Sequence, residues 1–178
     1  MTKDLVTITK TEKKITGKHI TPGVIEPSFG IGRILYSILE QSYYERENDE
    51  QRRVLSLPPQ IAPVKVSVLP LLMHDNMLDY IPKITGILTQ FGISSKVDDS
   101  GQSIGRRYAR TDEIGIPFGI TIDHETLSED SITLRERDST SQVRVKVQDT
   151  PMLLLQLING GITWEQVQQK YPKVESKE

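Results

Sequence analysis

The alternation of apolar and polar residues divides the chain into a C-terminal α/β region and a less regular N-terminal region. In the C-terminal region, residues with the two-residue period of strands occupy five segments, 64–69, 93–97, 117–122, 132–137 and 143–147. Helical spacing separates the first three of these segments. We therefore predict an α/β fold built on a mixed five-stranded sheet of βαβ units with flanking helices.

The predicted helices of this region are marked by apolar stripes and by residues that suit helix ends. The stripes predict helices over 80–90, 103–113 and 153–158. Gly92 and Gly115 suit the C-terminal caps of the first two. Thr163 and Gln166 resemble a capping box that opens a last helix, which Pro172 ends.

The N-terminal region predicts shorter elements. Alternation favours a hairpin over residues 6–15 and a strand at 24–26, which residues 27–30 interrupt. Helical spacing then predicts a helix over 31–44, followed by a charged run at 45–50, interpreted as a solvated helix end or loop, and a strand at 53–57. Prolines at 58, 59 and 63 mark a boundary, so we predict domains at 1–60 and 61–178.

Composition limits the function without defining it. The formal charge of the 178-residue chain is −2, which argues against a sequence-blind polyanion binder but not against the reading of specific bases. The chain has no cysteine, which excludes disulfides and thiolate metal sites, and its three histidines lack metal-ligand spacing. No stretch has the pattern of a secretory signal or a membrane span, so a cytoplasmic protein is expected, with a mitochondrial form left open.

Residues 24–33 combine groups that can bind a charged small molecule. A strand delivers the carboxylate of Glu26 and the hydroxyl of Ser28, and an arginine, Arg33, follows in the first turn of a helix. Glycine lets a ligand approach the backbone, a helix N-terminus favours anions, and arginine can hold a phosphate through two hydrogen bonds. On spacing alone, a tight strand-to-helix turn with a surface arginine is the favoured explanation of this segment.

A second candidate site is the basic helix at 103–113. Arg106 and Arg110 share one face of it, while Arg107 and Tyr108 point progressively away. Such residues can bind single-stranded RNA, whose unpaired bases are read by stacking and by hydrogen bonds to their edges. The alternative is that the arginines pair with nearby carboxylates at 98, 99, 112 and 113 and stabilise the domain.

These segments together resemble a known family. The sequence VIEPSFGIGR at 24–33 is similar to the third signature motif of class II aminoacyl-tRNA synthetases in their eukaryotic and archaeal glycyl form. The segments at 62–66, 96–100, 103–119 and 134–139 resemble the anticodon-binding domain of the same enzymes, in the same order. The resemblance implies a glycine-tRNA ligase that forms a glycyl-adenylate, with residues 1–60 as the end of its antiparallel catalytic domain.

The resemblance also implies roles for individual residues. It places the glycine pocket at Glu26, Pro27 and Ser28 and the ATP contacts at Gly30, Gly32 and Arg33. The candidates for tRNA contact are Arg106, Arg107, Tyr108 and Arg110. No room precedes Glu26 for the first two family motifs, so we expect the isolated chain to be inactive and to bind no cofactor or metal.

The expected partners follow from the same resemblance. They are a glycine-accepting tRNA, whose anticodons share two cytosines, and, in the full enzyme, glycine, ATP with Mg²⁺ and a second copy of the enzyme. Neither DNA nor a membrane is expected as a partner. A non-catalytic RNA-binding or dimerisation module is the main alternative, and a small-molecule nucleotide fold is a weaker one, because such sheets host many functions.

Overall fold

The computed structural model describes residues 3–47 and 49–174 and divides the chain into two units, Met1–Gly30 and Ile31–Glu178. In the first unit, a short 3₁₀ helix, η1 (Lys3–Leu5), precedes exposed residues without regular secondary structure. The predicted hairpin over 6–15 and the predicted strand at 24–26 are therefore wrong. The reason is that an isolated hairpin is marginally stable at best in water without a further layer to cover its apolar face.

The second unit begins with helix α1 (Ile31–Ser42), which continues directly into an antiparallel hairpin of β1 (Tyr43–Arg46) and β2 (Asp49–Leu55). The predicted helix is confirmed except for its last two residues. The interpretation of the charged run at 45–50 as a solvated helix end or loop is wrong, because strands occupy it on both sides of residue 48, which lies outside the described residues. Val54 anchors the hairpin, since its side chain is fully buried.

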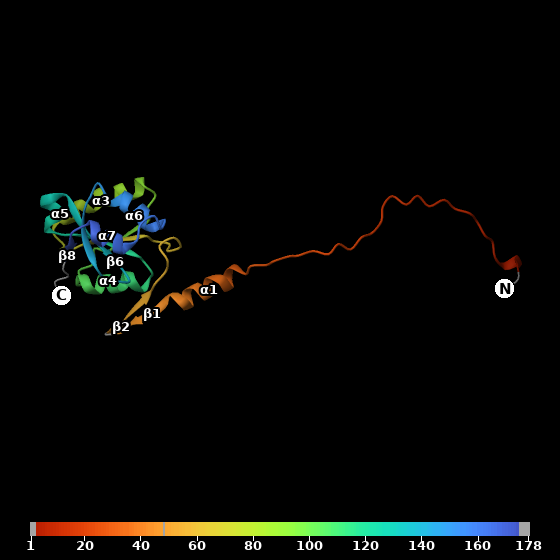
Figure 1. Cartoon of the computed structure of the whole chain (residues 1–178), viewed down its shortest axis with the longest axis horizontal. Coiled ribbons are helices and arrows are strands. Elements are labelled where there is room, and N and C mark those ends of the chain that lie inside the picture. Colours follow the sequence, from red (N-terminus) through yellow and green to blue (C-terminus); the bar gives the residue numbers. More distant parts are fainter. Residues whose placement is uncertain (1–2, 48, 175–178) are drawn as a thin grey trace. The chain divides into compact units, whose positions relative to one another are not determined.

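The remaining strands form one mixed six-stranded sheet (Figure 1). Its strands are β3 (Val66–Pro70), β4 (Ser95–Val97), β5 (Phe118–Ile122), β6 (Ser131–Glu136), β7 (Gln142–Lys146) and β8 (Lys173–Val174). They lie in the order β4-β3-β5-β6-β7-β8, with β4, β3 and β5 parallel and the later pairs antiparallel. The predicted mixed α/β sheet is confirmed, with the short β8 as one strand more than the five predicted.

Helices separate or follow these strands. They are α2 (Asp75–Leu78), α3 (Tyr80–Gln90), α4 (Ile104–Glu113), α5 (His124–Glu129), α6 (Thr150–Ile158) and α7 (Trp164–Lys170). The predictions of α3, α4, α6 and α7 are confirmed, whereas the short α2 and α5 were not predicted. Gly92 and Gly115 follow α3 and α4 with φ of 68° and 80°, a conformation that favours glycine. Among the described residues, no helix is long and apolar enough to cross a bilayer.

The two faces of the sheet differ in chemistry because successive side chains on a strand point to opposite sides. One face presents aliphatic residues such as Val68, Ile120 and Leu134, which pack against α3, α6 and α7 in the main core. The other face presents polar residues that are also buried, including Thr121 and Arg135. Figure 1 shows α3 and α6 on one side of the sheet and α4 on the other. Helix α4 therefore covers a polar layer, which contains the network described below.

Candidate functional site

A surface hollow of about 360 Å³ lies beside the start of β5, the β6–β7 turn and the connection from α6 to α7. We call it the groove; its volume is within the usual range of ligand pockets, roughly 300–1,000 Å³. Its apolar lining consists of Pro59, Pro117, Phe118, Leu157, Ile162 and Trp164. Its polar lining consists of Glu136, Arg137, Asp138, Ser139 and Glu165.

The β6–β7 turn forms one wall of the groove, and its shape is fixed by hydrogen bonds. The carboxylate of Glu136 accepts hydrogen bonds from the backbone N–H groups of Asp138 at 2.9 Å and Ser139 at 2.7 Å. Thr140 then adopts a φ of 58°, which is uncommon for a β-branched residue. The turn thus presents Asp138 and Ser139, both exposed, in a defined conformation.

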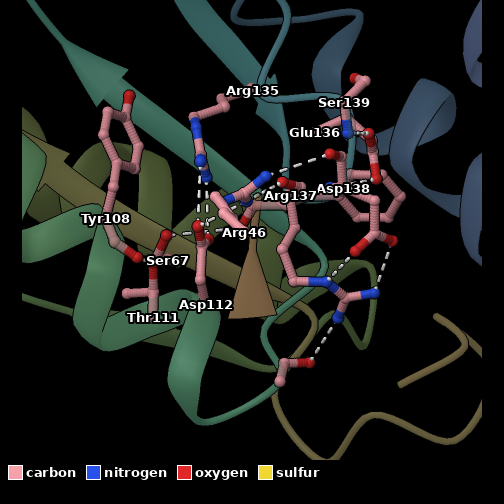
Figure 2. A network of polar contacts seen from close by, with 12 residues as sticks. Arg46, Ser67, Tyr108, Thr111, Asp112, Arg135, Glu136, Arg137, Asp138 and Ser139 are labelled. Carbon is pink, nitrogen blue, oxygen red and sulfur yellow. Dashed lines mark hydrogen bonds and ion pairs between the residues drawn. The ribbon is translucent and has the colours of Figure 1, made fainter. Parts of the chain in front are cut away.

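A buried arginine holds the side chain of Asp138 (Figure 2). The Arg137 guanidinium donates two hydrogen bonds to the Asp138 carboxylate, at 2.9 and 2.8 Å, and others to the carbonyl oxygens of Gly115 and Leu57, both at 3.1 Å. Burial opposes ionisation of Asp138, but the hydrogen bonds and charge of Arg137 outweigh it, so the pKa of Asp138 is lowered. Asp138 is therefore an oriented anion at the groove.

A second ion network lies between α4 and the sheet (Figure 2). Asp112 of α4 accepts two hydrogen bonds from Arg135 of β6, at 2.9 and 3.0 Å, and one from Arg46 of β1 at 3.1 Å. The Tyr108 ring covers the Arg135 guanidinium, whose central carbon lies 4.4 Å from the ring centre. The network joins the hairpin, α4 and the sheet through one buried carboxylate.

The indole of Trp164, also in the lining of the groove, is held by the hydroxyl of Ser141. Its Nε1 donates a hydrogen bond to Ser141 Oγ at 2.6 Å, and Ser141 Oγ lies 2.7 Å from Ser139 Oγ in the turn. The capping box of Thr163 and Gln166 fixes the start of α7, as predicted. Hydrogen bonds from its own backbone N–H and from Thr163 lower the pKa of Glu165, the residue after Trp164. The groove thus combines an apolar lining with exposed carboxylates that accept hydrogen bonds.

The candidate RNA-binding residues of α4 lie in different environments. Arg106 is exposed and donates a hydrogen bond to Gln102, and Arg110, also exposed, pairs with Asp98 at 2.9 Å. Arg107 is buried and donates to backbone carbonyl oxygens, including Pro70 O at 2.6 Å. Of these arginines, Arg110 thus forms the ion pair with a nearby carboxylate that the alternative interpretation predicted.

Tyr108, the fourth candidate on α4, is partly buried. Its hydroxyl is hydrogen-bonded to Thr121, and its ring covers Arg135. Both ends of the side chain therefore have partners within the domain. Contact between RNA and any of the four α4 residues stays a prediction.

The residues of the 24–33 motif fall in both units. Glu26, Pro27, Ser28 and Gly30 are exposed in the first unit, while Gly32 and Arg33 are exposed in the first turn of α1. No group of three or more His, Asp or Glu side chains among residues 3–47 and 49–174 is placed to hold a metal ion. The glycine and ATP roles of these residues stay predictions.

The central residues of the networks, which were not predicted from the sequence, are Arg46, Arg135 and Arg137. A signal existed for two of them, because Arg135 and Arg137 occupy alternate positions of the predicted strand at 132–137, which places both on one face of the sheet. Their burial indicates that this face is covered by another element. No such signal marks Arg46, which lies in a run of charged residues.

Comparison with known proteins identifies the class to which this α/β domain belongs. Residues 65–157 match the family described as the anticodon binding domain, and the chain belongs to this family. The chain is 50% identical to the glycine–tRNA ligase of Bombyx mori over 179 residues, covering 100% of the chain and 24% of that protein. It is also 47% identical to the ligase of Caenorhabditis elegans over 178 residues, 99% of the chain and 24% of that protein.

The similarity extends to archaea. The glycine–tRNA ligase of Methanocaldococcus jannaschii is 50% identical over 147 residues, which cover 83% of the chain and 25% of that protein. The chain thus spans about a quarter of the length of the curated relatives it matches. The resemblance to glycyl-tRNA synthetases and their anticodon-binding domain is confirmed.

Proposed function

We propose that this chain is the anticodon-binding part of a glycine–tRNA ligase and that its groove receives a base of the tRNA anticodon. The single observation that carries the proposal is the groove itself, in which an apolar lining meets exposed carboxylates and most lining residues belong to the matched anticodon-binding segment. The relatives are named as glycine–tRNA ligases, so the proposed RNA substrate is a glycine tRNA.

The chemistry of the groove fits the edge of a cytosine. A carboxylate accepts a hydrogen bond from the N4 amino group of cytosine, and the anticodons of glycine tRNAs share two cytosines. Asp138 and Glu165 line the groove with exposed carboxylates that can accept this hydrogen bond. The same negative charge repels phosphate, so the base edge enters the groove and the backbone stays outside it.

The RNA backbone requires cations elsewhere. Arg106 is the better candidate on α4, because it donates a hydrogen bond to the neutral side chain of Gln102, whereas Arg110 forms an ion pair with Asp98. A net charge of −2 leaves little attraction for RNA in general. The proposal therefore assigns selectivity to base contacts and a modest share of the affinity to phosphate contacts.

The catalytic activity belongs to the full-length protein in this proposal. That protein joins glycine to tRNA with ATP and Mg²⁺, acts in the cytoplasm and forms a homodimer. Glu26, Pro27 and Ser28 would contact glycine, and Gly30, Gly32 and Arg33 would contact ATP. Support for a larger protein comes from α1, whose apolar residues are exposed, Ile31 by 81% and Leu35 by 55%. Exposed apolar surface of this kind typically marks a contact with another part of the protein.

A charge-removing substitution in the groove tests the proposal. Glu165→Gln keeps the size of the side chain but weakens its ability to accept a hydrogen bond from an amino group. We expect the chain to bind a glycine-tRNA anticodon stem-loop about tenfold more weakly, as for loss of one base-specific hydrogen bond. Glu129→Gln on α5 removes an exposed carboxylate that does not line the groove and should leave binding unchanged. Equal affinity of all three proteins in a fluorescence-anisotropy titration would contradict the proposal.

A further inference from the structure

The turn that carries Asp138 is held by a strand outside the sheet to which the turn belongs. The Arg46 guanidinium, on β1, donates hydrogen bonds to the carbonyl oxygens of Arg137 at 2.7 Å and Asp138 at 3.3 Å. The hydroxyl of Tyr44, also on β1, donates to the Asp138 carboxylate at 3.3 Å. Three hydrogen bonds therefore connect the hairpin with the groove wall across more than 90 residues of sequence.

The geometry of the hairpin orients the side chains of Tyr44 and Arg46 toward the turn. Tyr44 and Arg46 are the less exposed residues of β1, as expected for alternate positions on one face of a strand. The register of β1 with β2 shifts between Glu45 and Arg46, an irregularity of the kind that redirects side chains. The same Arg46 guanidinium pairs with Asp112, which fixes its position against α4.

The position of the hairpin in the chain gives these contacts a meaning beyond packing. The match to the anticodon-binding family covers residues 65–157, so β1 and β2 lie before it. Yet the groove wall is held by β1, and β1 continues without a break from α1, the helix that carries Arg33. The groove therefore takes part of its support from the segment that the sequence assigns to the other domain.

We propose that the β1–β2 hairpin is a working part of the groove, in which Arg46, assisted by Tyr44, positions the Asp138 turn for base recognition. Arg46 acts through Asp138 and touches no base itself. This inference rests on the proposed function for its RNA component. The placement of the turn can also be measured without RNA, because the single tryptophan of the chain, Trp164, lines the same groove.

Two substitutions test the proposal at different strengths. Arg46→Lys keeps a positive charge beside Asp112 but lacks the planar fork that reaches two carbonyl oxygens and a carboxylate together. Tyr44→Phe removes only the hydroxyl that contacts Asp138 and spares the ion network. Arg53→Lys in β2 is the matched control, because Arg53 pairs with Glu45 at 3.8 Å with both side chains largely exposed.

The first measurement is acrylamide quenching of Trp164 fluorescence in the RNA-free chain. The Trp164 indole is connected to the turn through Ser141 and Ser139, so a displaced turn should open access to it. We expect faster quenching in Arg46→Lys, a smaller increase in Tyr44→Phe and none in Arg53→Lys. Thermal unfolding of each variant identifies the temperature range in which all four proteins are folded, and the quenching is compared there.

The second measurement is the ratio of affinities for a cognate anticodon stem-loop and for one with a substituted cytosine. Loss of hydrogen bonds from a charged group should reduce this ratio about tenfold in Arg46→Lys, and less in Tyr44→Phe. If the wild-type chain discriminates and both variants retain its ratio and its quenching, the hairpin inference is overturned and the proposed function stands. If the wild-type chain does not discriminate, the proposed function fails and the RNA component of the inference fails with it.

Discussion

Replacing Asp112 with asparagine should strongly destabilise the second unit, because this carboxylate neutralises two arginines. Asp112 bonds Arg135 through both oxygens and Arg46 through one, and its side chain is 5% exposed. Asparagine has the same size and keeps one acceptor oxygen. The substitution therefore removes the charge while it leaves the packing of α4 against the sheet in place.

The magnitude follows from the burial of Arg135, whose side chain is 7% exposed. Burial opposes the charge of Arg135, but the hydrogen bonds and charge of Asp112 outweigh it, so its pKa is raised and it stays protonated. Without Asp112, this guanidinium is a buried charge without its carboxylate. Breaking a buried pair in this way typically costs about 3–5 kcal/mol. Because asparagine still accepts one hydrogen bond, we expect a loss of about 3 kcal/mol in the free energy of unfolding.

Urea unfolding followed by circular dichroism measures this loss. With a slope of about 1–3 kcal/mol per molar urea, a loss of 3 kcal/mol lowers the midpoint by roughly 1–3 M. Asp130→Asn is the control, since the Asp130–Lys83 pair is exposed by about half and such pairs contribute about 1 kcal/mol or less. A second variant, Asp112→Asn with Arg135→Met, removes both charges and should recover part of the stability.

The result that would refute this reasoning is a loss below 1 kcal/mol for Asp112→Asn, similar to that of the Asp130 control. The two guanidiniums would then be solvated or paired elsewhere when the carboxylate is removed. A double variant less stable than Asp112→Asn would also contradict it, because it would assign the loss to packing rather than to an unpaired charge.

Two further predictions concern the same unit. Gly115→Ala should cost about 2 kcal/mol in the free energy of unfolding, because φ is 80° there and a Cβ would lie 2.9 Å from Leu57 Cδ1. Gly92→Ala, with φ of 68° and no atom within 4 Å of the added Cβ, should cost about 1 kcal/mol, and equal losses in urea unfolding would argue against the close contact. Asp123 should contribute stability above its ordinary pKa of about 4 that is lost as the pH falls through its folded value. Burial opposes its ionisation, but hydrogen bonds and charge from Arg144 outweigh this and lower the pKa of Asp123, so Asp123→Asn should flatten the dependence of stability on pH below about 5.

Local patterns predicted most of the α/β fold because its strands and helices have regular, buried periodicities. The strand at 117–122 and the helix at 80–90 agree with the structure to within a residue or two at each end. The β1–β2 hairpin could not be predicted in this way. Its charged residues suggest solvent exposure. The partners of Arg46 include Asp112 and the carbonyl oxygen of Arg137, which lie far along the chain.

The candidate site was only partly accessible from the sequence. Helical spacing separated the exposed face of α4, with Arg106 and Arg110, from Arg107, which is buried. The groove gave no sequence signal, because its lining comes from residues between Pro59 and Glu165 that meet only in the folded domain. The roles of Glu26 and Arg33 depend on family resemblance, since their spacing alone also fits an ordinary turn.

The central claim, that this chain reads an anticodon, is tested most directly by one titration. The chain is titrated with a glycine-tRNA anticodon stem-loop and with stem-loops in which either shared cytosine is replaced, all at one salt concentration, because salt changes every affinity for RNA. The account predicts that each replacement weakens binding by about 1–3 kcal/mol, the usual contribution of one specifically contacted base. Equal affinity for all the stem-loops would contradict anticodon recognition by this chain.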